Sequence, residues 1–131
     1  MRQFVTVSAG GRRKLVPLED IVEIVPMLAL GNVDGQNDLC RGIANLRGEL
    51  IPVFDLTGPS EPLLPSRFIL VARAGDMRIG LIVDDVHDVL GIEDDRLLNR
   101  PVGGGRTSLL VNHEGAALAV INPAEAIGYG A

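Results

Sequence analysis

Tryptophan is absent from this sequence, and aromatic side chains as a class make up only 3% of its 131 residues. Platforms on which nucleic-acid bases could stack are therefore missing. Basic charge is also scarce, because 12 lysines and arginines stand against 17 acidic residues and give a net charge of −5. Phosphate binding requires a basic face. The composition therefore argues against nucleic acid as a partner.

The sequence also has little of what marks secreted and membrane proteins. Cys40 is the single cysteine, which excludes an internal disulfide and is typical of a reducing compartment. The longest apolar run, residues 24–30, is interrupted by Pro26 and is far shorter than the roughly 20 residues that span a bilayer. Residues 1–11 contain no apolar stretch of the kind found in signal peptides. We therefore expect a cytoplasmic domain that does not insert into a membrane.

Acidic residues gather between positions 84 and 95, where a metal site could be suspected. The segment LIVDDV, with Asp84 and Asp85, is similar to the first strand of a response-regulator receiver, in which paired carboxylates bind magnesium. A receiver also needs a lysine on a later strand, and the sole lysine here is Lys14, far upstream. A solvated acidic edge that discourages strand pairing is the better interpretation.

The sequence also offers no convincing candidate for a catalytic group. His87 and His113 are the only histidines, and neither lies in a predicted helix, so we expect exposed residues at strand ends. The glycines at 103–105 are followed by no lysine and no well-capped helix, so they predict a flexible loop and not a phosphate site. No nucleophile has a recognisable base beside it. The sequence therefore predicts neither enzyme activity nor a metal or cofactor.

What the sequence does contain is apolar residues, 47% of the total, in short runs separated by turn residues. We expect a helical turn at 18–21 and a short closing helix at 124–127, with Asn122 as its cap and Pro123 as its first residue. About ten short strands punctuated by turns indicate an all-β fold, most simply small barrels within one domain covering residues 1–131. The predicted strands are 4–7, 14–17, 22–25, 43–46, 50–54, 67–74, 77–83, 86–92, 108–111 and 118–121.

One hairpin, residues 41–56, reads RGIANLRGELIPVFDL and places a charged corner, Arg47-Gly48-Glu49, between two apolar strands. It resembles the motif G-V-x-N-L-R-G-x-x-I-P-V-x-D-L of the CheW family, the coupling proteins of bacterial chemosensory arrays. Residues 78–90, RIGLIVDDVHDVL, are similar to a second family segment, and VPLEDIVEI at 16–24 is similar to a third. Residues 118–127 give a weaker fourth match. The matches occur in family order along nearly the whole chain.

The resemblance implies a fold and a set of partners. The fold would be all-β, with two five-stranded SH3-like β-barrel subdomains that share a hydrophobic interface and carry short helical turns. The activity would be that of a non-catalytic scaffold or adaptor without cofactors. Its partners would be the regulatory domain of the histidine kinase CheA and the cytoplasmic tip of a chemoreceptor, a methyl-accepting chemotaxis protein, at membrane-associated arrays.

The resemblance also implies roles for particular residues. Arg47 matches an arginine that pairs with the glutamate matched by Glu23; the alternative is that Arg47 solvates a turn. Ile21 and Gly42 match positions associated with kinase or receptor binding, with core packing and a bulge or close backbone approach as their respective alternatives. Three apolar residues match strands that line the receptor groove, and core packing explains them at least as well: Phe68, Ile69 and Val86.

The sequence departs from the family pattern in places, which leaves its pathway open. A proline common before the hairpin is missing near Asn37, and the segment 97–108 is short. The favoured hypothesis is an adaptor between receptor and kinase. The alternatives are an adaptor of a non-flagellar pathway that governs pili or a surface response and, from another class, a small acidic signalling protein that binds a metal or ligand.

Overall fold

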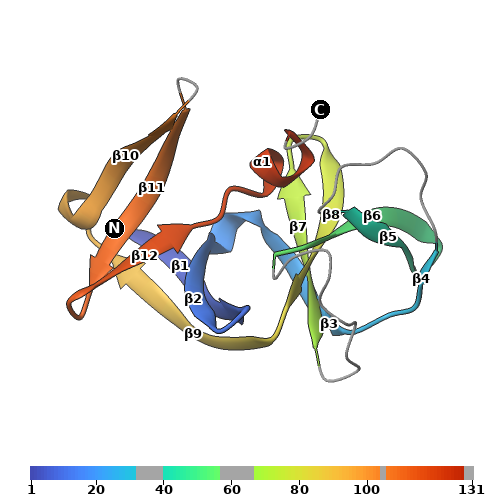
Figure 1. Ribbon diagram of the computed structural model, residues 1–131. Coiled ribbons are helices and arrows are strands. Elements are labelled where there is room, and N and C mark those ends of the chain that lie inside the picture. The colour runs from blue at the N-terminus through green and yellow to red at the C-terminus, as the bar shows by residue number, and fades with distance from the viewer. Residues whose placement is uncertain (32–39, 57–66, 104–105, 129–131) are drawn as a thin grey trace.

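The computed structural model describes residues 1–31, 40–56, 67–103 and 106–128, and Figure 1 shows two β-sheets side by side. The predicted loop at 58–65, the glycines 104 and 105, and the position near Asn37 lie outside the described residues. Sheet A has the strand order β10-β11-β12-β2-β1-β9, and sheet B has the order β3-β7-β8-β6-β5-β4. The all-β prediction with two subdomains is confirmed.

The strands of both sheets follow one another closely along the chain. Sheet A contains β1 (Arg2–Ala9), β2 (Arg12–Pro17), β9 (Asp85–Ile92), β10 (Leu97–Gly103), β11 (Arg106–His113) and β12 (Ala116–Val120). Sheet B contains β3 (Ile21–Pro26), β4 (Leu30–Gly31), β5 (Cys40–Leu46), β6 (Glu49–Asp55), β7 (Phe68–Ala74) and β8 (Met77–Val83). The helical elements are two 3-10 turns, η1 (Leu18–Asp20) and η2 (Asp94–Arg96), and one α-helix, α1 (Pro123–Gly128).

Each sheet has six strands where the sequence had predicted five. The additional strand in sheet B is β4, which is two residues long and pairs with β5 at Leu30↔Ala44 and Gly31↔Ile43. In sheet A it is β10, which contains Pro101 and was not among the predicted strands. Because β10 is an edge strand, a proline without an N–H group is tolerated there.

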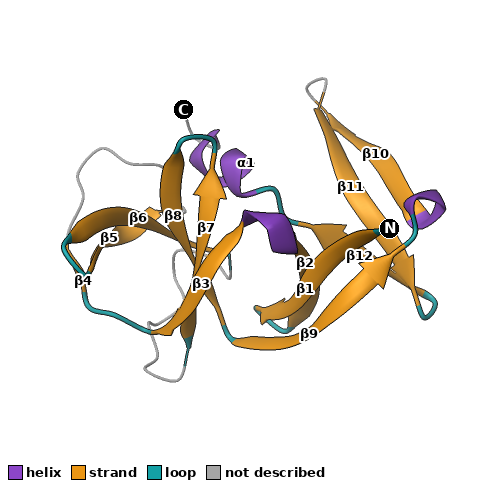
Figure 2. Cartoon of the chain, turned by 180° about the vertical axis from the view of Figure 1, so that it is seen from behind, coloured by secondary structure: helices purple, strands orange, loops and turns teal. Residues whose placement is uncertain are grey.

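The chain crosses between the sheets at a few short connections. It passes from β2 to β3 through η1, and from β8 to β9 through the single residue Asp84. Figures 1 and 2 both show β9 leaving the sheet B half and running into the sheet A half. After β12 the chain returns, and α1 packs against β7. Parallel pairing occurs between β12 and β2 and between β6 and β8.

Buried apolar side chains form three clusters. The junction cluster joins Val5, Val7 and Val16 of sheet A to Leu70 and other residues of sheet B, including Phe54, Ala72, Ala74, Ile79, Leu81 and Val83. The sheet B cluster contains Ala44, Leu46, Ile51, Val53, Ile69, Val71 and Ile82. The sheet A cluster contains Phe4, Leu15, Ile92 and Val111. Strands β7 and β8 thus have both faces covered, which explains why their sequences are continuously apolar instead of alternating.

Candidate functional site

The β5–β6 hairpin carries the predicted charged corner, and its turn consists of Arg47 and Gly48. Leu46 pairs with Glu49, so the loop has two residues. Both have positive φ angles, 51° at Arg47 and 92° at Gly48, as a type I′ turn requires. The Asn45 side-chain oxygen accepts a hydrogen bond of 2.8 Å from the Gly48 N–H. The turn is therefore closed by Asn45 and Gly48, and it does not require an arginine side chain.

The Arg47 side chain instead reaches Glu23 on β3. Its Nη2 atom forms an ion pair and hydrogen bond with Glu23 Oε1, as the family resemblance had implied. The side chains are 67% and 29% exposed, so the arginine faces solvent beyond the contact. Strand β3 is the first in the order of sheet B and β5 is the fifth. The pair therefore holds the hairpin tip against a strand from the opposite end of the sheet.

A second exposed ion pair lies on the other side of the same hairpin. Arg78 Nη1 of β8 is 3.3 Å from Glu49 Oε1, and both side chains are about half exposed. Leu50 beside it is 68% exposed. Charged and apolar atoms thus alternate over a few residues at this end of sheet B, which is the composition expected of a contact surface with a polar rim.

Gly42 is buried and lies at a bulge of β5, where the register with β6 shifts between Cys40 and Gly42. Its φ is +146°, and a Cβ atom there would lie 2.4 Å from Gly31 O and 3.0 Å from Leu30 Cβ. The geometry therefore supports the structural alternative for this residue, a bulge with a close backbone approach. A role of Gly42 in partner contact stays a prediction.

The four apolar residues predicted to contact partners differ in solvent exposure. Ile21, Phe68 and Val86 are partly buried and pack against the junction cluster. Phe68 starts β7 in sheet B, whereas Val86 lies near the start of β9 in sheet A. Ile69 is 0% exposed and belongs to the sheet B cluster, so its side chain has no surface to offer a partner directly. The core-packing alternative explains Ile69.

The acidic stretch divides into residues of two kinds. Asp85 and Asp88 are exposed on the edge strand β9, as expected of a solvated acidic edge, and Asp85 accepts a hydrogen bond of 2.8 Å from the Val86 N–H. Asp84 differs, because it forms an ion pair with Arg67 and accepts a hydrogen bond from the Gly10 N–H. Within the described parts of the chain, no three His, Cys, Asp or Glu residues are grouped so as to hold a metal ion.

The two histidines also differ from each other. His113 ends β11, as expected of a strand-end residue, although its side chain is only 25% exposed. His87 is partly buried within β9, and its Nε2 atom lies 2.6 Å from the Ser8 hydroxyl of β1. The prediction of an exposed strand end is therefore wrong for His87. The error arose because the sequence could not show that β1 pairs with β9.

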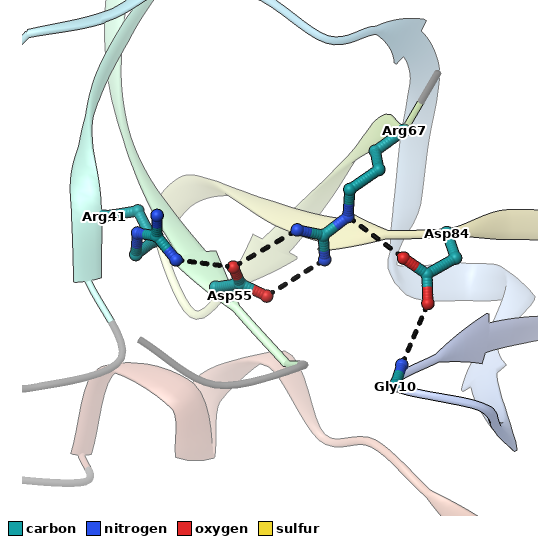
Figure 3. Close-up of polar contacts among 5 residues, drawn as sticks. All are labelled: Gly10, Arg41, Asp55, Arg67 and Asp84. Carbon is teal, nitrogen blue, oxygen red and sulfur yellow. Dashed lines mark hydrogen bonds and ion pairs between the residues drawn. The ribbon is translucent and has the colours of Figure 1, made fainter. Parts of the chain in front are cut away.

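Sequence reasoning missed the most deeply buried charges of the described chain, which Figure 3 shows. Asp55 and Arg67 are 0% and 3% exposed. Arg67 donates to both carboxylate oxygens of Asp55, and Arg41 donates to Asp55 Oδ2 across 3.0 Å. A sequence signal exists, because both Asp55 and Arg67 adjoin apolar strands, LIPVF and FILVA, where an unpaired charge would be costly.

Asp20, in η1 just before β3, is a carboxyl group whose environment raises its pKa. Partial burial raises its pKa above the ordinary value of 3.8, and the neighbouring Glu19 carboxylate acts in the same direction. Arg2 of β1 and Arg73 of β7 lower it in part. The group therefore lies between cationic residues that come from both sheets.

Comparisons with known proteins agree with the fold. The family model of the CheW-like domain matches residues 3–128. The chain is 35% identical over 81 residues to protein PilI of Pseudomonas aeruginosa, covering 59% of this chain and 46% of PilI. It is 23% identical over 105 residues to the chemotaxis protein CheW of Bacillus subtilis, covering 77% of this chain and 67% of that protein. The aligned parts thus span about half to two thirds of these relatives.

A crystal structure has the same fold. The scaffolding protein TtCheW from Thermoanaerobacter tengcongensis is similar with a TM-score of 0.79 and 22% sequence identity, and the match covers 92% of this chain and 88% of that one. Among the described residues, no helix has the length and apolarity needed to cross a bilayer.

Proposed function

This chain belongs to the family of CheW-like domains, and from that membership we propose that it is a non-catalytic adaptor of bacterial chemosensory signalling. In this proposal it acts in the cytoplasm as a single CheW-like domain. It binds the regulatory domain of a CheA-type histidine kinase and the cytoplasmic tip of a chemoreceptor. The proposal requires no cofactor and no metal.

The observation that carries the proposal is the backbone conformation of Arg47. A φ of 51° is a left-handed conformation that asparagine and glycine adopt readily and that costs other residues about 1 kcal/mol or more. Arginine is therefore a poor choice for the turn itself. Its presence is explained by its side chain, which pairs with Glu23 and is 67% exposed. Strain accepted for the sake of an exposed side chain is typical of recognition sites.

The predicted partner residues fall into two regions. Glu23 and Arg47 form one region at the tip of the β5–β6 hairpin, and Ile21 packs against the junction cluster with Phe68 and Val86. Phe68 and Val86 lie where the two sheets meet, one on each sheet. Two separate regions suit an adaptor with two partners. Contacts of modest area are sufficient for this function if many copies attach simultaneously in an array, because linked weak contacts give a high overall avidity.

A non-flagellar pathway is the second candidate, and the resemblance to PilI supports it. That relative has a name from the pilus system and is 35% identical to this chain over the aligned residues. The adaptor chemistry would be the same in either pathway, so the two candidates differ in their partners and not in their site. Deletion of the gene, followed by assays of swimming and of surface motility, distinguishes them.

Binding and kinase activity test the proposal directly. Calorimetry should detect association with the regulatory domain of the cognate kinase in the micromolar range and, separately, with a soluble fragment of the receptor tip. Added to both, the protein should increase autophosphorylation of the kinase. The protein itself should accept no phosphate. Failure to bind either partner, or stable phosphotransfer to Asp84 or Asp85, would overturn the proposal and favour a small acidic ligand-binding protein.

The Arg47→Asn variant tests the observation that carries the proposal. Asparagine suits the left-handed turn, so the hairpin should remain folded while the ion pair with Glu23 is lost. We expect unchanged thermal stability together with weaker coupling between receptor and kinase. Arg78→Gln is the matched control, because it removes the other exposed arginine of the same surface, the one that pairs with Glu49. Equal effects of the two variants on coupling would show that Arg47 has no special role.

A further inference from the structure

Asp84 occupies the point where the chain crosses from sheet B to sheet A. It is the one residue between β8 and β9, and its backbone N–H donates a hydrogen bond of 2.7 Å to Ser8 O of β1. Its Oδ2 atom accepts a hydrogen bond of 2.9 Å from the Gly10 N–H, in the turn between β1 and β2. Asp84 is thus fixed to sheet A by both its backbone and its side chain.

The same carboxylate is attached to sheet B through Arg67. Asp84 Oδ1 lies 3.0 Å from Arg67 Nε in an ion pair that lacks hydrogen-bond geometry, while the other two guanidinium nitrogens donate hydrogen bonds to Asp55 at 3.4 and 3.0 Å. Arg41 of β5 contacts Asp55 from the other side. Figure 3 shows these side chains in a row from Arg41 to Gly10. A series of alternating charges therefore connects the hairpin of sheet B with the first turn of sheet A.

This series of charged groups can fix the relative orientation of the two sheets, which the apolar junction cannot do. Hydrophobic contact is non-directional, so Val7 and Leu70 would remain buried if one sheet rotated slightly against the other. Charge-assisted hydrogen bonds are directional. Here Arg67 donates them to Asp55 and the Gly10 N–H donates one to Asp84, and the Arg67–Asp84 ion pair joins the two. Buried ion pairs add little net stability compared with apolar packing, and in some proteins they select one arrangement. The Arg67 guanidinium is the element of the junction that is suited to fixing the angle between the sheets.

Two of the predicted partner residues lie beside this series. Phe68 follows Arg67 directly on β7, and Val86 follows Asp84 closely on β9. Both pack against the junction cluster, one from each sheet. We propose that Arg67 and Asp84 are positioning residues, which set the separation of Phe68 and Val86 and thereby shape the surface that a receptor segment contacts. The identity of that partner rests on the proposed function.

The Asp84→Asn variant tests this role against its neighbour Asp85→Asn. Asparagine keeps an oxygen for the Gly10 N–H but loses the ion pair with Arg67, whereas Asp85 contacts the adjacent Val86 N–H. Both variants remove one charge at adjacent positions. We expect Asp84→Asn to lower affinity for the receptor-tip fragment by about 2- to 30-fold, the range for residues that act without touching the ligand. Asp85→Asn should leave affinity unchanged. Wild-type affinity in Asp84→Asn, or equal losses in both variants, would overturn the proposal.

Distance measurements test the geometry without any partner. Spin labels on Leu50→Cys in sheet B and Val89→Cys in sheet A, introduced together with Cys40→Ser, report the arrangement of the sheets, because both sites are exposed. Asp84→Asn should broaden or shift the distance distribution, and Asp85→Asn should not. An unchanged distribution in Asp84→Asn would overturn the proposal even if wild-type protein binds its partners.

Further measurements separate positioning from a general loss of structure. Thermal unfolding should show that Asp84→Asn remains folded, with affinity for the kinase regulatory domain reduced less than affinity for the receptor fragment. Asp84→Ser, which also removes the carboxylate, is a second variant if asparagine prevents folding. Absence of binding by wild-type protein would contradict the proposed function, whereas the spin-label distances would still decide the role of Arg67 and Asp84.

Discussion

The two central strands β7 and β8 of sheet B are packed on both faces, whereas sheet A contains a hollow. Strands β7 and β8 lie between the junction cluster and the sheet B cluster, and residues such as Leu70 and Ile82 are 0% exposed. Both sheets expose some apolar side chains: Val89 on β9 and Leu98 on β10 in sheet A, and Leu50 on β6 in sheet B, are more than half exposed. A hollow of about 510 Å³ also opens in sheet A, lined by Thr6, Arg13, Asp88, Leu90, His113, Glu114, Ala116 and Leu118.

The hollow has a cause in the strand pairing. Strand β12 pairs with β2 at Ala119↔Lys14 and Val120↔Leu15, and Arg13 and Ala116, which precede these positions on the two strands, line the hollow. The difference predicts that shortening a core side chain costs more at β7 and β8 of sheet B than beside the hollow of sheet A. The junction cluster and the crossing at Asp84 join the two sheets.

The largest difference should appear when a core side chain is shortened in each sheet. Ile82→Ala removes a fully buried side chain from the sheet B cluster and should lower the free energy of unfolding by about 2–5 kcal/mol. Leu118→Ala in sheet A removes a partly buried side chain that already borders open space, so we expect about 1 kcal/mol. Urea unfolding measures both. Equal losses would show that the two sheets are packed alike.

Glycine substitutions sharpen the comparison within sheet B. Gly42→Ala should cost about 2–3 kcal/mol, because the added Cβ would approach Gly31 O within 2.4 Å in a left-handed backbone. Gly48→Ala is the control, since its φ of +92° is also unfavourable but no atom lies within 4 Å of the new Cβ. We expect about 1–2 kcal/mol there. A Gly42→Ala variant as stable as Gly48→Ala would mean that β4 moves away easily.

This result bears on how Gly42 can be used in binding experiments. If Gly42 contacted the kinase, a charged residue there would weaken binding through steric and desolvation cost at the contact. Because Gly42 is buried, such a variant would disturb β4 and β5 first. Leu50, which is 68% exposed on the same hairpin, is a better position at which to probe a contact.

A smaller effect on stability is expected from the ion pair that sheet B presents to solvent. Glu23→Arg and Arg47→Glu should each change the free energy of unfolding by no more than about 1 kcal/mol, as for other exposed pairs. Each should uncouple receptor from kinase in a reconstituted array. The double variant should recover part of the coupling if pairing fixes the surface. Recovery of none would mean that Arg47 contacts an acidic group of the receptor instead.

The sequence predicted what depends on local patterns. Apolar runs bounded by glycine and proline predicted the strands, and the motif of residues 41–56 predicted the Arg47–Glu23 pair. The sequence did not predict β4, which is too short to give a pattern, or β10, whose proline and glycine are typical of a loop. The roles of Asp55, Arg67 and Asp84 were also missed. Their roles depend on contacts between strands that are distant in sequence, and local sequence patterns do not predict such contacts.

The smallest effect should come from Asp20, which lies between the sheets. Because burial and Glu19 raise its pKa in the folded protein, the folded state binds the proton more tightly than the unfolded state does. Stability from this group is therefore fully present below the ordinary pKa of 3.8 and is lost as the pH rises through the raised value. At neutral pH the ionised carboxylate is slightly destabilising, so Asp20→Asn should increase the free energy of unfolding.

The increase should shrink as the pH falls and should vanish once both states of the wild type are protonated. Asp76→Asn is the control, because Asp76 is exposed in the turn between β7 and β8. Urea unfolding at several pH values measures the difference. Arg2 and Arg73 oppose the shift from opposite sheets, so replacing either with glutamine should enlarge the gain from Asp20→Asn. A loss of stability in Asp20→Asn at neutral pH would show that these arginines outweigh burial and hold the two sheets together through the carboxylate.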